Sequence, residues 1–97
     1  MGHVFITRAV PGRAIEHLEA AGHSVETWPG QLPPPPGALA GRLAAADAAL
    51  TTVADFISSE MLAAAPRLKV VANMAAGYDN IDPAVAAALG IWVTNTP

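Results

Sequence analysis

Five short strand-like segments alternate with four segments whose apolar residues recur at helical spacing, and this alternation restricts the fold most strongly. A connection of helical length between successive strands predicts a parallel sheet covered by helices through right-handed crossovers. The expected fold class is α/β, a flavodoxin-like parallel sheet of order 2-1-3-4-5 lacking its last helix. The expected strands are Val4–Ile6, Ser24–Trp28, Ala48–Thr52, Leu68–Asn73 and Ile91–Thr94.

Caps and breakers delimit the four expected helices. Asp82 can accept hydrogen bonds from first-turn amides, Pro83 fits the first helical position, and Gly90 can close the helix in a left-handed conformation. The run of four prolines at 33–36 predicts an extended, stiff loop, because proline fixes its own φ. The helices are expected at 11–21, around Leu39 to Ala46, from the Ser58 cap to Pro66, and from Asp82 to Gly90.

Composition excludes several classes of function. Ninety-seven residues suffice for one small domain, expected at 1–97. The net charge of -3, with only 5 Lys and Arg residues, offers no basic face for nucleic acid. The absence of cysteine rules out disulfides and thiolate zinc sites. No leader and no apolar run of about 18 residues is present, so we expect a cytoplasmic domain that neither enters nor spans a membrane.

The loop after the fourth strand is the best candidate for a ligand site. Ala75, Ala76 and Gly77 follow the apolar run at 70–72, where a parallel strand would emerge at its carboxyl end. Ligands bind at that edge in open α/β sheets, because exposed backbone N–H groups and helix amino ends gather there. Small side chains let a ligand approach the backbone closely.

Two motifs resemble a known family. Residues 73–82 (NMAAGYDNID) and 90–97 (GIWVTNTP), together with Phe5–Arg8, Leu50–Thr52 and Ala64–Val70, are similar to the D-isomer-specific 2-hydroxyacid dehydrogenases. Within that family they look most like the glyoxylate and hydroxypyruvate reductases. The resemblance covers essentially the whole chain. It implies that this chain is the first part of the family's smaller, substrate-binding domain and that the nucleotide-binding domain is absent.

The resemblance also implies roles for particular residues. Backbone amides around Ala76 and Gly77 would hold the carboxylate of a 2-keto acid, with Ala75 beside them and Val53 lining the cleft. The family's catalytic Arg, Glu and His would lie in the missing part, so no catalytic residue is expected here. The parent would use NAD or NADP, yet this chain has no G-x-G-x-x-G and is expected to bind no cofactor and to be inactive alone.

Other polar residues have plainer explanations. Asp79 and Asp82 could be an acid and base pair, but capping by Asp82 and turn bracing by Asp79 are the stronger interpretations. Tyr78 could bind a ligand or, as favoured here, pack against the neighbouring domain. Arg8 could attract an anion, although a surface ion pair is favoured. The chain's histidines lack metal-cluster spacing: His3, His17 and His23.

Two rival functions fail on the chemistry of their sites, and two others remain open for the chain and its parent. A phosphoacceptor receiver would need acidic residues where Thr7-Arg8 and Thr51-Thr52 stand, and a flavodoxin would need a richer phosphate loop than residues 8–12. An inert, truncated domain that forms homo-oligomers through an uncovered sheet face is the serious rival. The parent could also act on another 2-keto acid or on phosphoglycerate.

Overall fold

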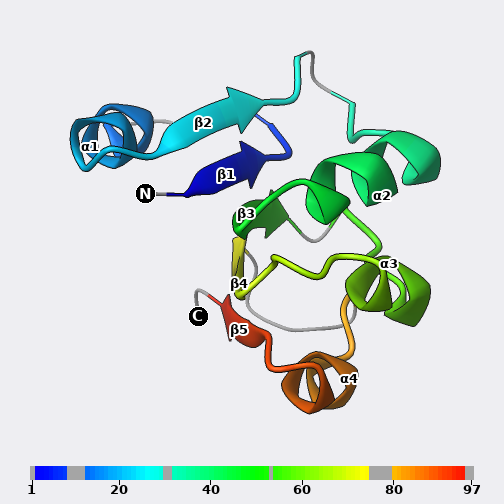
Figure 1. Cartoon of the computed structure of the whole chain (residues 1–97). Helices are drawn as coiled ribbons and strands as arrows, with labels where there is room; N and C mark the ends of the chain where they lie inside the picture. Colours follow the sequence, from blue (N-terminus) through cyan, green and yellow to red (C-terminus); the bar gives the residue numbers. More distant parts are fainter. Residues whose placement is uncertain (1, 9–12, 30–31, 53, 75–79, 96–97) are drawn as a thin grey trace.

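The computed structural model describes residues 2–8, 13–29, 32–52, 54–74 and 80–95. These residues form one five-stranded parallel sheet in the order β2-β1-β3-β4-β5, as the sequence predicts (Figure 1). None of the helices in these ranges is both long and apolar enough to cross a membrane. The elements are β1 His3–Ile6, α1 Ala14–Ala20, β2 Ser24–Thr27, α2 Pro36–Ala44, β3 Ala48–Thr52, α3 Ser59–Ala63, β4 Val70–Met74, α4 Pro83–Ala88 and β5 Trp92–Asn95.

Side-chain caps begin two of the helices. The Ser58 hydroxyl accepts a hydrogen bond from the Met61 amide at 3.2 Å and so starts α3. One carboxylate oxygen of Asp82 accepts from the amides of Ala84 and Val85, at 2.9 and 3.3 Å, and so starts α4. These bonds satisfy amides that have no partner within the helix. Both predicted caps are confirmed.

The proline run divides between loop and helix. Pro35 is extended, with φ -59° and ψ 154°, and precedes α2 as its N-cap. Pro36 is already the first residue of α2, where its missing N–H costs nothing. The prediction that all four prolines form a loop is therefore wrong at its last residue. The predicted stop at Gly90 is confirmed, because this residue follows α4 with φ 77°.

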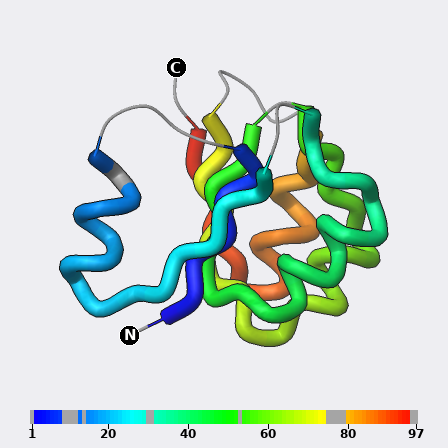
Figure 2. The backbone as a smooth tube through the Cα atoms, turned by 90° about the horizontal axis from the view of Figure 1, so that it is seen from above, coloured from blue at the N-terminus to red at the C-terminus, as the bar shows by residue number. Residues whose placement is uncertain are grey.

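Helices α2, α3 and α4 cover one face of the sheet, and α1 lies on the other (Figure 2). The covered face contributes Phe5, Ala49 and Val71, which are at most 2% exposed. Each fully buried large apolar side chain stabilises the fold by about 1.5–3 kcal/mol. This core fixes the three central strands against α2–α4. Its other members are Leu39, Leu43, Ala46, Ile57, Leu62, Ala65, Leu68, Ile81, Ala86 and Ile91.

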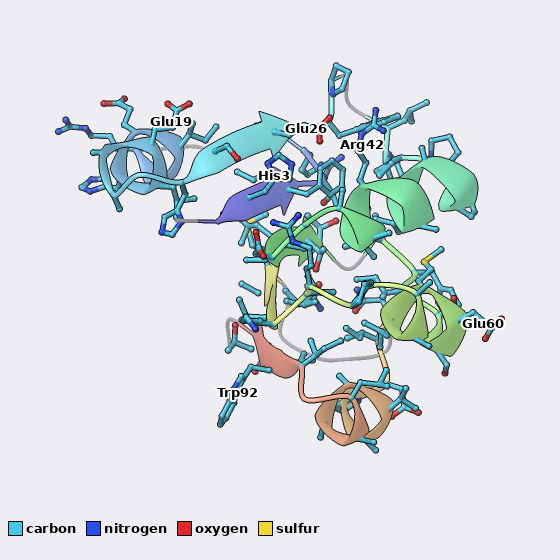
Figure 3. The ribbon with its side chains drawn as sticks, in the orientation of Figure 1. His3, Glu19, Glu26, Arg42, Glu60 and Trp92 are labelled. Carbon is cyan, nitrogen blue, oxygen red and sulfur yellow. The ribbon has the colours of Figure 1, made fainter. Side chains whose placement is uncertain are left out.

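The opposite face becomes more exposed with distance from α1. Neighbours in register point to the same face of a parallel sheet, and the row Val4, Ala48, Val70, Trp92 crosses four strands. Val4 is 8% exposed, Ala48 and Val70 are half-buried, and Trp92 is 76% exposed. The prediction of an under-covered face is therefore confirmed toward β5. In Figure 3 the Trp92 side chain points away from the sheet.

Asp47 ties the amino edge of the sheet together. Its carboxylate accepts from the backbone amide of His3 at 2.7 Å and from the Arg67 guanidinium at 3.0 Å. The hydrogen bond from His3 and, after it, the Arg67 charge lower the pKa of Asp47 below its usual 3.8. On the edge strand β2, Glu26 lies between His3, at 3.5 Å, and Arg42, at 3.0 Å (Figure 3). These polar contacts stand at the amino ends and flank of the sheet, away from the ligand edge.

Candidate functional site

Buried polar side chains gather where β1, β3 and β4 end. Thr7 directly follows β1, Thr51 and Thr52 close β3, and Asn73 is the penultimate residue of β4. Two further polar residues reach them from the loops after β3 and β4. All six contact at least one other member, and we call the set the edge network: Thr7, Thr51, Thr52, Asp55, Asn73 and Asn80.

Asp55 joins the ends of β1 and β3. One carboxylate oxygen, Oδ2, accepts from the Thr7 hydroxyl at 2.5 Å and from the amide and hydroxyl of Thr52 at 2.8 and 3.2 Å. The side chain is 2% exposed. Among the described residues, its Oδ1 atom is the buried side-chain oxygen without a hydrogen-bond partner. A buried acceptor with this many donors on one oxygen holds its loop in a single geometry.

Asn80 joins the loop after β3 to the end of β4. Its side-chain amide donates to the backbone carbonyls of Thr52, at 3.0 Å, and Asp55, at 2.9 Å. Its carbonyl oxygen accepts from the Asn73 amide at 2.9 Å, and Asn73 in turn accepts from the Thr51 hydroxyl at 2.9 Å. A backbone hydrogen bond joins the same two segments, since the Ile57 amide donates to the Asn80 carbonyl at 2.8 Å.

The edge network brackets both segments that carry the predicted site residues. Val53 lies between Thr52 and Ala54, and the predicted residues Ala75, Ala76 and Gly77 lie between Met74 and Asn80 in sequence. Those four residues fall outside the described ranges, as do Tyr78 and Asp79. The structure therefore fixes the anchors of the candidate site and leaves the carboxylate-binding assignment as a prediction.

A groove of about 460 Å³ opens beside the network, between the starts of α3 and α4. Its lining includes Phe56, Ser58, Glu60, Asn80 and Asp82. Two of these residues are acidic, so the groove is unsuited to an anion. Ser58 and Asp82 already accept hydrogen bonds from first-turn amides, so these two polar groups of the groove serve the fold as helix caps.

The remaining sequence candidates are not members of the edge network. Asp82 is exposed and caps α4, which confirms the role favoured for it, while its pairing with Asp79 lies outside the described residues. Arg8 follows β1 at the ligand edge and is half-buried. His3 bonds to Ser24 at 2.8 Å on the amino side. Within the described ranges, no group of three or more His, Cys, Asp or Glu residues is placed to hold a metal ion.

Sequence reasoning missed the edge network, although one signal was available. Asn73 stands two residues after Val71 in a buried strand, so both side chains must point to the same covered face. A buried amide requires hydrogen-bond partners. Asn80 and Asp55 gave no comparable signal, because several of their partners lie far along the chain. Thr7 and Asp55, for example, are 48 residues apart.

The fold is of the doubly wound α/β class, in which ligands bind outside the carboxyl ends of the strands. The family model described as "D-isomer specific 2-hydroxyacid dehydrogenase, catalytic domain" matches residues 4–97. The chain therefore belongs to the D-isomer specific 2-hydroxyacid dehydrogenase family. The resemblance noted in its sequence is confirmed.

Relatives agree on this family over nearly the whole chain. The glyoxylate reductase of Thermococcus kodakarensis is 48% identical over 94 residues, which cover 97% of this chain and 28% of that protein. The crystal structure of TT0316 protein from Thermus thermophilus superposes with a TM-score of 0.92 at 37% identity, covering 98% of this chain and 30% of that one. An NAD⁺-bound 3-phosphoglycerate dehydrogenase from Entamoeba histolytica gives a TM-score of 0.79 at 27% identity, covering 99% and 33%. The chain thus spans about 28% of the length of the curated relatives it matches.

Replacing Asp55 tests whether the edge network is a structural anchor. Asp55→Ala leaves the Thr7 hydroxyl and the Thr52 amide without their acceptor, at a cost of about 1–3 kcal/mol for each buried group left unpaired. We expect the free energy of unfolding in urea to fall by at least this amount. Glu19→Ala, at an exposed position of α1 (Figure 3), is the control and should stay within about 0.5 kcal/mol of wild type. Equal stability of the two variants would contradict the anchoring role.

Proposed function

We propose that this chain is the N-terminal part of the substrate-binding domain of an NAD(P)H-dependent 2-hydroxyacid dehydrogenase. The parent would reduce 2-keto acids of the glyoxylate and hydroxypyruvate type. The observation that carries the proposal is 48% identity to a glyoxylate reductase over 97% of this chain. The reaction would deliver a hydride to the carbonyl carbon and a proton to its oxygen. We also propose a cytoplasmic location, which suits a reaction between a small soluble metabolite and a soluble cofactor.

The carboxylate of the keto acid would be held at the carboxyl edge of the sheet. Backbone N–H groups of Ala76 and Gly77 would donate to it, with Ala75 beside them and Val53 lining the cleft. Hydrogen bonds from converging N–H groups to a carboxylate are charge-assisted and therefore strong. Support comes from the described anchors, since Thr52 and Asn80 border these segments and are themselves hydrogen-bonded. Holding the acid group in one position would align its carbonyl for hydride transfer.

The cofactor would be held by a different part of the parent protein. No G-x-G-x-x-G occurs anywhere in the 97 residues, so this chain does not supply the glycine-rich turn that carries a dinucleotide pyrophosphate. The relative with bound NAD⁺ is about three times as long as the stretch it shares with this chain, which covers 33% of it. We therefore propose that a nucleotide-binding domain completes the parent and closes the site against water.

A phosphoglycerate-type substrate is the second candidate. The structural neighbour described as a 3-phosphoglycerate dehydrogenase favours it, with 27% identity and a TM-score of 0.79. The glyoxylate reductases are more similar in sequence, at 48% for the one from Thermococcus kodakarensis. The two candidates differ in the group attached to the keto acid, so one assay can compare them.

Turnover by the full-length polypeptide and by the 97-residue chain tests the proposal. We expect the full-length protein to oxidise NADH or NADPH with glyoxylate and hydroxypyruvate, at higher kcat/KM than with 3-phosphohydroxypyruvate. The 97-residue chain should give no turnover, because it lacks the cofactor half. Loss of reduced-nicotinamide absorbance is the measurement. A full-length protein inactive on every 2-keto acid, or a short chain that turns over alone, would contradict the proposal.

We also propose that the sheet face around β5 packs against a second copy of the chain. Trp92 is 76% exposed on this face, and burying such a side chain is favourable by about 25 cal/mol for each Å² removed from water. Light scattering of the 97-residue chain should give a dimer or larger species. Trp92→Glu should shift it toward the monomer, because a charge would be buried in the contact. A wild-type chain that stays a folded monomer would contradict the packing.

A further inference from the structure

The side chain of Asn80 connects the loop after β4, in which it lies, to the loop after β3. It is 5% exposed, and its amide nitrogen lies within 3.0 Å of the Thr52 carbonyl and 2.9 Å of the Asp55 carbonyl. These two carbonyls belong to the residues that flank Val53 and Ala54. Asn80 itself ends the segment that begins after Met74. The geometry therefore links the segment after β3 to the segment after β4 through one amide group.

The contact pattern requires a side chain that both donates and accepts. The nitrogen donates to backbone carbonyls, while the oxygen accepts from the Asn73 amide at 2.9 Å. Asparagine provides two N–H donors and a carbonyl acceptor on a short stem. Aspartate has the same shape but, when ionised, only accepts, so it would face the Thr52 and Asp55 carbonyls with no proton to share.

The chain's other contacts at this place make the link rigid. Asn73 is 1% exposed and is itself held by the Thr51 hydroxyl at 2.9 Å. The carboxylate of Asp55 accepts from the Thr52 amide at 2.8 Å, so the loop bonded by Asn80 is also closed on itself. A buried network whose members hold one another fixes position more firmly than its separate bonds would.

We propose that Asn80 is a positioning residue for the 2-keto acid, acting through the two loop anchors rather than by touching the substrate. The inference rests on the proposed function, in which Val53 and Ala75–Gly77 receive the acid group. Asn80 would set the distance between those two segments. Displacing a binding group by about 1 Å can lower kcat/KM by about 100-fold, even when the substituted residue does not contact the substrate.

The experiment uses two substitutions at Asn80 and one control in the full-length protein. Asn80→Asp keeps the shape and removes the donors, and Asn80→Ala removes the whole amide. Ile91→Val is the control, because Ile91 is buried at 4% exposure and immediately precedes β5 at the opposite, amino edge of the sheet. It weakens packing without touching the edge network.

Two readouts separate a positioning role from general loss of stability. Steady-state kinetics with glyoxylate should show kcat/KM lowered about 10- to 100-fold in both Asn80 variants, mainly through KM, with the KM for the nicotinamide cofactor unchanged. Hydrogen exchange of the Asp55 and Ile57 amides should be faster in the Asn80 variants, because these amides belong to the loop that Asn80 anchors. Ile91→Val should change neither readout.

The outcomes are distinguishable from failure of the proposed function. Unchanged exchange at Asp55 and Ile57 would overturn the link between the loops, whatever the activity. Faster exchange with unchanged KM for glyoxylate would overturn the positioning role alone. A wild-type protein that reduces no 2-keto acid would overturn the proposed function and the positioning role together, while the exchange result would still decide whether Asn80 holds the loop.

Discussion

Hydrogen bonds to two buried side chains, Asp55 and Asn80, organise the carboxyl edge of this sheet. A parallel sheet leaves its strand ends without ladder partners, and buried polar groups at those ends are costly unless they are paired. The Asp55 carboxylate accepts hydrogen bonds from residues at the ends of β1 and β3. The Asn80 side chain, which lies shortly before α4, donates to carbonyls at the end of β3 and in the loop after it. The carboxyl edge thereby acquires fixed anchors in a region where loops otherwise have few constraints.

The two faces of the sheet are covered to different extents. One face is closed by α2, α3 and α4 over a continuous apolar core that includes Phe5 and Val71. The other is closed only near α1 and opens toward Trp92. A rigid core behind the edge network and an apolar face beside β5 suit a domain that keeps its own shape while meeting another surface. The relatives extend well beyond the region they share with this chain.

Local signals were sufficient to predict the fold. The Ser58 and Asp82 caps, the stop at Gly90 and the alternation of strands and helices are all read from neighbouring residues, and they are confirmed. The edge network was not predicted, because most of its contacts join residues that meet only after the chain has folded. The carboxylate-binding residues Ala75, Ala76 and Gly77 came from the family resemblance and remain a prediction, since they lie outside the described ranges. The proline run was misjudged by one residue, where the first helical position tolerates Pro36.

A crystal structure of the full-length protein with bound oxalate, a stable carboxylate analogue of glyoxylate, tests the central claim most directly. The account predicts one carboxylate of oxalate within hydrogen-bond distance of the backbone N–H groups of Ala76 and Gly77. It also predicts that the Asn80 amide still donates to the carbonyls of Thr52 and Asp55. Oxalate bound away from the carboxyl ends of β3 and β4, or an Asn80 side chain turned away from both carbonyls, would contradict it.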